Sequence, residues 1–293
     1  MREAQGAVPA PSNVNRTLTG ESVWRQQGDG RDDAFWREYL TNGTPADRRN
    51  RRIFRHLPRE PRCRLCAAPF TGMGAPIMRL AGRRPATQNP NICAACFTFI
   101  SRRHGGAEIE CTMLFADIRG STAIAEAISP SAFRELLDRF YTAACSVVFK
   151  YDGTVDKFVG DELVAIFMPM FCGDRHAELA VKAAQELLRV AGHAAADGRW
   201  VGVGAGVHTA TTWFGTVGQG SHREVTAVGD AMNVTARLAS AAGAGEVLVT
   251  TAAALAAGLD PALVRHTLGL KGRQEPVEVV GLQVPPDAAH RTE

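Results

Sequence analysis

The sequence predicts an α+β protein in which a largely antiparallel sheet follows a small cysteine-rich N-terminal module. Three observations support this prediction. From residue 109 onward, short apolar runs typical of strands alternate with segments whose apolar residues recur at helical spacing. Two of the strand-like runs are separated by only two residues, which is typical of an antiparallel hairpin. Four of the seven cysteines form two Cys-x-x-Cys pairs before residue 100.

The composition is that of a folded protein without a membrane span. Hydrophobic residues make up 45% of the 293 residues and charged residues 22%, which are ordinary values for globular domains. No run approaches the roughly 18 uninterrupted apolar residues that a membrane-spanning helix needs. The polar N-terminus also lacks the apolar core of a signal peptide. We therefore expect a cytoplasmic protein of about two domains.

The N-terminal third of the chain is basic. Residues 1–106 carry 18 arginines, no lysine and eight acidic residues, whereas residues 107–293 carry 15 basic and 22 acidic residues. We interpret the arginines as a solvated surface and do not expect nucleic acid as a partner. The polar composition of residues 1–30, with little apolar pattern, predicts a mostly disordered segment. Residues 31–60 predict a short helical segment, broken at Asn42-Gly43 and restarted with Thr44 as the cap and Pro45 as the first helical residue.

Residues 61–104 predict a metal-binding module. The candidate ligands are Cys63 and Cys66 from one pair and Cys93 and Cys96 from the other, with 26 residues between the pairs. Because two such pairs can place four thiolates around one tetrahedral ion, we expect a structural Zn²⁺, with an iron–sulfur centre as the alternative. Disulfides are not expected in a chain without a secretion signal. The other three cysteines are expected in the core.

The larger predicted domain covers residues 107–283 and is followed by a short tail at 284–293. Its predicted elements are a strand at 109–116, a long helix that begins at Ser129 and Pro130, strands at 154–159 and 162–167, a helix at about 176–196, a strand at 201–208, a glycine-rich hairpin region at 213–228, a helix at about 230–242, and short strands that end with 276–282. Serine followed by proline is a typical helix start. Gly160-Asp161, between the two paired strands, is typical of a tight hairpin turn.

Two carboxylates lie where predicted strands end. Asp117 follows the first strand and precedes a turn of small residues that opens a helix, and Asp161 lies at the tip of the hairpin. The backbone N–H groups of such a turn can hold phosphate. Either aspartate alone would be ordinary turn chemistry. Two carboxylates beside a phosphate cradle indicate a divalent-metal site for phosphoryl chemistry.

Three motifs in this order resemble the class III nucleotidyl cyclases. They are Phe115-Ala-Asp-Ile-Arg-Gly-Ser-Thr122, Lys157-Phe-Val-Gly-Asp-Glu162 and Thr226-Ala-Val-Gly-Asp-Ala-Met-Asn-Val-Thr-Ala-Arg237. The resemblance covers about residues 107–283. It implies a ferredoxin-like βαββαβ core that is active as a head-to-tail homodimer. It also implies that two Mg²⁺ or Mn²⁺ ions assist the conversion of ATP to cyclic AMP and pyrophosphate.

The resemblance implies a role for individual residues. Asp117 and Asp161, with the Ile118 carbonyl, would hold the metal ions, and the backbone of Ile118, Arg119, Gly120, Ser121 and Thr122 would contact phosphate. Lys157 and Thr226 would read the purine edge, Asn233 would position the ribose, Arg237 would stabilise the transition state, and Lys271 would bind the terminal phosphates. We expect ATP, because an ammonium donor and a hydroxyl acceptor match N1 and the 6-amino group of adenine.

Two other functions remain open. One is a guanylate cyclase, and the other is a catalytically silent, nucleotide-sensing scaffold with a metal-knuckle binding module. A Rossmann site is excluded because Gly202, Gly204 and Gly206 lie in a predicted strand and do not precede a helix. A diguanylate cyclase of the GGDEF type is excluded because that motif's first glycine and final phenylalanine are absent around Gly160-Asp161.

Overall fold

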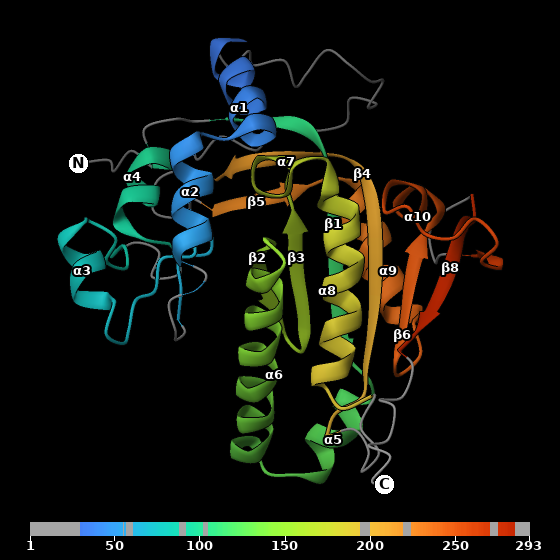
Figure 1. The fold of residues 1–293 in the computed structure, drawn as a ribbon. Helices are drawn as coiled ribbons and strands as arrows, with labels where there is room; N and C mark the ends of the chain where they lie inside the picture. Colours follow the sequence, from blue (N-terminus) through green and yellow to red (C-terminus); the bar gives the residue numbers. More distant parts are fainter. Residues whose placement is uncertain are drawn as a thin grey trace, which may run out of the picture.

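The computed structural model describes residues 30–54, 56, 61–87, 92–101, 105–193, 200–218, 224–269 and 275–284. An eight-stranded sheet forms its centre (Figure 1), with the order β2-β3-β1-β4-β6-β8-β7 and with β5 paired to β4 outside this path. The strands are β1 (Gly106–Ile118), β2 (Thr154–Val159), β3 (Glu162–Phe167), β4 (Val203–Val217), β5 (Glu224–Val228), β6 (Glu246–Thr250), β7 (Arg265–Leu268) and β8 (Val277–Gln283). All described pairings are antiparallel except that of β4 with β6. The predicted α+β class is confirmed.

The helices are α1 (Gly30–Asn42), α2 (Pro45–Phe54), α3 (Ala75–Leu80), α4 (Ala94–Ser101), α5 (Ser121–Ala127), α6 (Pro130–Lys150), α7 (Pro169–Cys172), α8 (His176–Val190), α9 (Asp230–Ala241) and α10 (Thr251–Ala256). Several helices begin at a capping residue or at a proline, as α6, α7 and α10 do. The Asp47 N–H donates to the Thr44 hydroxyl at 3.0 Å, which confirms the predicted restart. The Ala132 N–H likewise donates to the Ser129 hydroxyl at 3.2 Å.

Two predicted boundaries differ from the structure by more than three residues. The helix expected to reach about residue 196 ends at Val190, because Gly192 takes a positive φ of 87° and the next N–H groups bond back to the last turn. The strand expected over 201–208 continues to Val217 as β4. It pairs with β1 along the whole length of β1, so the strand continues past residue 208. The hairpin expected within 213–228 is confirmed, because Trp213–Val217 of β4 pairs antiparallel with β5.

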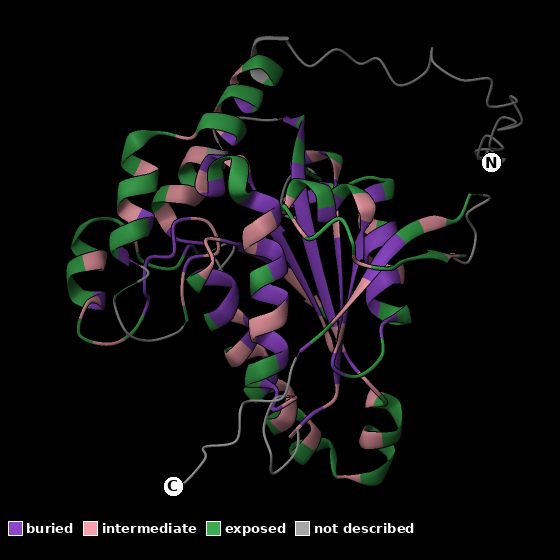
Figure 2. Cartoon of the chain, turned by 45° about the vertical axis from the view of Figure 1, so that its right-hand side comes forward, coloured by how far each residue is buried: buried purple, intermediate pink, exposed green. Residues whose placement is uncertain are grey.

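Strand β1 divides the core into two layers, because alternate side chains of a strand point to opposite faces. Leu114, Ala116 and Ile118 pack with residues of α6, α8 and α10. Ile109, Met113 and their neighbours on the other face pack with residues of α9 and α1. Figure 2 shows the buried strands between the two layers.

The N-terminal segments pack against the sheet and against α6. Trp36 and Leu40 of α1 are each 1% exposed and belong to the same apolar cluster as the second face of β1. A smaller cluster joins Phe54, Cys63 and Cys93 to Phe149 of α6. None of the helices in the described ranges combines the length and the apolar character that a bilayer crossing needs.

Candidate active site

The end of β1 and the tip of the β2–β3 hairpin bring two carboxylates together. Asp117 lies opposite Glu162 in the register of β1 with β3, so the tip residue Asp161 lies beside the end of β1. Burial raises the pKa of Asp117 to about 7, the Asp161 carboxylate adds to this shift, and Arg119 opposes it. Burial, and then the charge of Asp117, also raises the pKa of Glu162 to about 7. The site therefore concentrates negative charge in a partly buried position.

This donor set fits a divalent cation. Oδ2 of Asp161 is buried and has no hydrogen-bond partner among the described residues. Leaving a buried acceptor unpaired is costly, and bound cations are a common partner for such an oxygen. Carboxylate and carbonyl oxygens are the ligands that Mg²⁺ and Mn²⁺ prefer. Asp117, Asp161 and the Ile118 carbonyl therefore offer a chemically suitable set.

The side chain of Arg119 connects the carboxylates to the end of α9. Its guanidinium pairs with the Asp117 carboxylate and donates to the carbonyl oxygens of Ser240 at 2.8 Å and Ala242 at 3.3 Å. The sequence motif pointed only to its backbone, so this contact was missed. Gly120 takes a positive φ of 71° before α5, which begins at Ser121 and Thr122 without a capping side chain.

Lys157 and Thr226 come from different strands and meet at one buried carboxylate. The Thr226 hydroxyl donates to Oδ2 of Asp156 at 2.8 Å, and Nζ of Lys157 lies 3.4 Å from the same oxygen. Asp156 is 3% exposed, and its pKa is raised by burial although Lys157 and Thr226 act against this shift. The sequence did not predict a role for Asp156. Neighbouring residues of a regular strand point to opposite faces, so Asp156 would be expected to point away from the face that carries Lys157.

Asn233 and Arg237 lie one turn apart on α9. Asn233 is exposed and Arg237 is half-buried, and neither side chain forms a hydrogen bond or ion pair with another residue of the described ranges. The glycines of β4 let α9 approach closely, since a Cβ at Gly206 would lie 2.6 Å from the Ala239 nitrogen and one at Gly204 2.7 Å from the Ala242 oxygen. Close helix packing therefore accounts for the alternating glycines.

The predicted site residues form two groups in one chain. Within the described part of the protein, no hydrogen bond or ion pair joins the Asp117–Asp161 pair to the Lys157–Thr226 pair. Lys271 lies outside the described residues.

The four cysteines of the two Cys-x-x-Cys pairs form one cluster. The sulfur atoms of Cys63, Cys66, Cys93 and Cys96 all lie within 4.8 Å of one another. The Cys93 N–H donates to the Cys63 sulfur at 3.2 Å, and hydrogen bonding with the other three thiols lowers the pKa of the Cys93 thiol. Four sulfur ligands at this spacing suit Zn²⁺ or an iron–sulfur centre. The other cysteines, Cys111, Cys145 and Cys172, are buried or half-buried, as expected.

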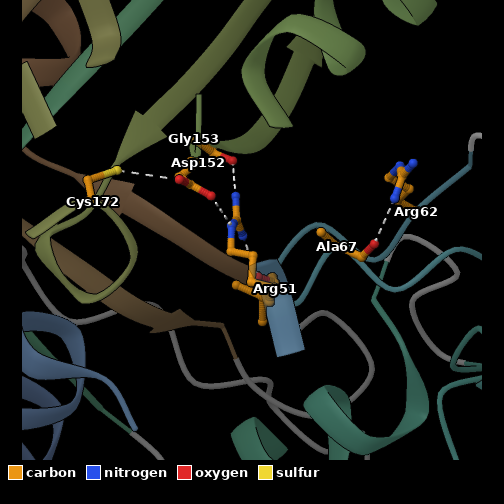
Figure 3. A network of polar contacts seen from close by, with 7 residues as sticks. Arg51, Arg62, Ala67, Asp152, Gly153 and Cys172 are labelled. Atoms are coloured by element: carbon orange, nitrogen blue, oxygen red, sulfur yellow. Dashed lines mark hydrogen bonds and ion pairs between the residues drawn. The ribbon is translucent and has the colours of Figure 1, made fainter. Parts of the chain in front are cut away.

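Two arginines tie the cysteine module to the start of β2. Arg51 is 2% exposed and donates to the Leu65 carbonyl at 2.5 Å and to the Gly153 carbonyl, and its Nε lies 3.9 Å from the Asp152 carboxylate (Figure 3). Arg64, between Cys63 and Cys66, donates to the backbone carbonyl of Asp156. Sequence reasoning had interpreted the arginines of this region as a solvated surface, and for Arg51 that interpretation is wrong.

Comparison with known proteins bears on residues 106–279, which match the family model described as "Adenylate and Guanylate cyclase catalytic domain". An adenylate cyclase of Anabaena cylindrica is 32% identical over 137 residues, which cover 43% of this chain and 26% of that protein. Adenylate cyclase 1 of Rhizobium meliloti is 33% identical over 135 residues, which cover 44% of this chain and 20% of that protein. The chain thus spans about a quarter or less of these relatives.

Solved structures share the fold of the larger domain. A crystal structure of a guanylyl cyclase matches with a TM-score of 0.55 and 24% identity, over 64% of this chain and 98% of that chain. The adenylyl cyclase CyaB from P. aeruginosa matches with a TM-score of 0.53 and 26% identity, over 60% of this chain and 94% of that chain. Both matches leave more than a third of this chain unmatched, in agreement with an additional segment beside the shared domain.

Proposed function

The chain belongs to the family of adenylate and guanylate cyclase catalytic domains, and from this we propose that it is an adenylate cyclase, converting ATP to cyclic AMP and pyrophosphate. The observation that carries the choice of ATP is the meeting of Lys157 and Thr226 at one carboxylate oxygen. An ammonium donor and a hydroxyl beside each other match the N1 acceptor and the 6-amino donor of adenine. Adenylate cyclases among the relatives support the same substrate.

The chemistry follows from the groups of this chain. Asp117, Asp161 and the Ile118 carbonyl would hold two Mg²⁺ or Mn²⁺ ions, which when bound make a ribose 3′-hydroxyl more acidic and neutralise phosphate charge. Asn233 would hold the ribose so that its 3′-oxygen points at the α-phosphorus. Arg237 would donate to the phosphoryl oxygens as charge develops there. The 3′-oxygen would bond to the α-phosphorus and its proton would pass to water or to a phosphate oxygen. The bond from the α-phosphorus to the oxygen that bridges to the β-phosphate would break, and pyrophosphate would leave with Lys271 as a further cationic partner.

We propose that each site is shared between two copies of the chain. Asp117 and Asp161 would come from one copy, and Lys157, Thr226, Asn233, Arg237 and Lys271 from the other, in a head-to-tail homodimer. The absence of contacts between the two groups within the described part of one chain supports this arrangement. So does the exposed Asn233, whose side chain is available to a second chain.

The proposed substrate is tested by supplying ATP and GTP in separate assays, with Mg²⁺ and with Mn²⁺. We expect kcat/KM for ATP to exceed that for GTP by ten- to a hundredfold, because a mismatched buried donor costs about 1–3 kcal/mol. Cyclic nucleotide formation is measured by chromatography. Equal or faster turnover of GTP would favour a guanylate cyclase. Tight nucleotide binding without turnover of either would favour the silent scaffold.

For the N-terminal cysteine cluster we propose a structural Zn²⁺, with an iron–sulfur centre as the alternative. The cluster's burial supports a structural role, since three of its four cysteines are buried. A closed set of four protein ligands leaves no open position for a substrate. The metal would hold the segment that carries Arg64 against the larger domain.

A further inference from the structure

We propose that Asp156 determines the base specificity of the purine site by fixing the direction of the Thr226 hydroxyl proton. The proposal rests on the proposed function, because it concerns the site at which that reaction would read its nucleotide. Asp156 acts through Thr226 and is therefore a positioning residue. Its carboxylate lies within bonding distance of both purine-reading side chains.

The direction of the proton follows from the hydrogen-bond inventory. A threonine hydroxyl has one proton and two lone pairs, and an ionised carboxylate oxygen can only accept. The ammonium of Lys157, 3.4 Å from Oδ2 of Asp156, favours the ionised carboxylate. The Thr226 proton is therefore committed to Asp156, with which it bonds at 2.8 Å. Only lone pairs of Thr226 remain for a second partner.

An acceptor at this position separates the two purines. Adenine carries a 6-amino group, which donates a hydrogen bond, whereas guanine carries a 6-oxo group, which only accepts. A freely rotating threonine hydroxyl would serve either base. A hydroxyl whose proton is held by Asp156 can accept a hydrogen bond from the 6-amino group of adenine. With guanine, its lone pairs would face those of the 6-oxo group, and no hydrogen bond would form.

A β-bulge allows Asp156 to act beside Lys157. Val155 pairs with Ala165 and Lys157 pairs with Val164, so Asp156 is the extra residue between two successive pairs. In a regular strand the side chains of residues 156 and 157 would point to opposite faces, whereas bulges redirect side chains. Here the two charged groups lie within 4 Å of each other.

The residues around Asp156 and Thr226 hold these two side chains in place. Asp156 is 3% exposed and Thr226 6% exposed, so little water is available to replace their bond. The Asp156 carbonyl accepts a hydrogen bond from Arg64, which fixes the backbone of the bulge. The other carboxylate near Lys157, that of Glu224 at 3.9 Å, is 51% exposed in its side chain, and among the described residues it forms no hydrogen bond with Thr226.

The test measures the ratio of kcat/KM for ATP to kcat/KM for GTP in the full chain. We expect Asp156→Ala to lower this ratio about tenfold, the effect of one donor–acceptor mismatch, because the freed hydroxyl can donate to the 6-oxo group. Asp156→Asn should keep the ratio within threefold of wild type, since its amide oxygen can replace Oδ2. Glu224→Gln is the matched charge control and should also keep it. Both substrates are measured on one preparation, so a loss of folded protein cancels from the ratio.

An unchanged ratio in Asp156→Ala would overturn the proposal. An equal fall in Asp156→Asn would also overturn it, because charge rather than hydroxyl direction would then carry the selectivity. If Asp156→Ala lacks turnover, displacement of a fluorescent ATP analogue by ATP and by GTP gives the same ratio, with circular dichroism to confirm folding. If Asp156→Ala does not fold, Asp156→Ser takes its place. Absence of cyclic product from wild type with either nucleotide would instead refute the proposed function.

Discussion

Arg51 is the residue whose environment departs most from what a basic sequence leads one to expect. Its guanidinium lies 4.1 Å from the centre of the Phe171 ring and bonds to carbonyls of two distant segments, at Leu65 and Gly153. Burial lowers its pKa, while Asp152 raises it. A planar cation with several fixed donors can satisfy such a set, whereas lysine presents a single point charge.

Replacing Arg51 by methionine should lower the free energy of unfolding by about 2–4 kcal/mol, because the Leu65 and Gly153 carbonyls lose a donor and Asp152 loses the ion pair with Arg51. Arg52→Met is the matched control, since Arg52 is exposed on the same helix, and its effect should stay within about 0.5 kcal/mol. Chemical denaturation of both variants measures the difference. Equal stability of the two variants would show that the Arg51 contacts contribute little.

Residues of the candidate site differ in how far sequence could predict them. Asp117 and Asp161 follow strand ends in recognisable motifs, and the sheet register brings them together. Asp156 could not be predicted, because its position depends on a bulge that no residue pattern announces. The burial of Arg51 likewise depends on packing between segments about a hundred residues apart.

At the scale of elements, the packing of α9 on β4 positions Asn233 and Arg237. The helix lies so close that a side chain at Gly206 would meet the Ala239 nitrogen at 2.6 Å. We expect Gly206→Ala to lower the free energy of unfolding by about 1–3 kcal/mol, as overpacking does, and to reduce kcat. Gly269→Ala serves as the stability control, because a Cβ there would have no atom within 4 Å. Denaturation curves that coincide for the two variants would contradict this packing argument.

The cysteine module gives a second prediction at this scale. The purified chain should contain about one zinc or iron equivalent if four thiolates hold one ion, and Cys63→Ser should remove it. Cys145→Ala, a half-buried cysteine outside the cluster, should retain the metal. Elemental analysis together with thiol titration measures both. A metal-free wild-type chain with all its cysteines reactive would refute the proposed site.

Element boundaries were predictable where local chemistry defines them. Thr44 and Ser129 cap helices as expected because a cap is a contact across three residues. The length of β4 was not predictable, because residues 209–217 are held in the strand by pairing with β1 and with β5. Sequence patterns therefore predicted the start of a helix at a capping residue better than the end of a strand that depends on tertiary pairing.

At the scale of the whole molecule, the N-terminal segments and the cyclase-like domain share apolar clusters. Trp36 packs in one cluster with Met113, and Cys93 packs in another with Phe149. The change of composition near residue 106 led us to expect two modules, and composition does not reveal such packing. Removal of residues before 107 would uncover one face of β1.

The proposed shared site gives a prediction for two inactive variants. Asp117→Ala and Asn233→Ala homodimers should each be nearly inactive, because each change affects both sites. After subunit exchange, half of the dimers are mixed and each holds one intact site of two, so activity should return to roughly a quarter of wild type. A cyclic AMP assay measures the recovery.

The matched control mixes Asp117→Ala with Asp161→Ala. These changes lie in the same half of the proposed site, so every mixed dimer has two broken sites and no activity should return. Lack of recovery in the first mixture, after exchange is verified, would mean that one chain builds the whole site. Recovery in the control would contradict the assignment of both aspartates to one half.

Arg64 is one residue from Cys63 and bonds to the carbonyl of Asp156. The proposed binding of a metal ion to the cysteines and the proposed binding of nucleotide beside Asp156 would therefore share one piece of backbone. Free energy depends only on the states compared, and coupling between two ligands is therefore reciprocal. If an ion bound to the cysteines changes the affinity for nucleotide by some factor, bound nucleotide must change the affinity for that ion by the same factor. A cell rich in ATP would then hold the metal more tightly if the coupling is positive, and release it more readily if it is negative.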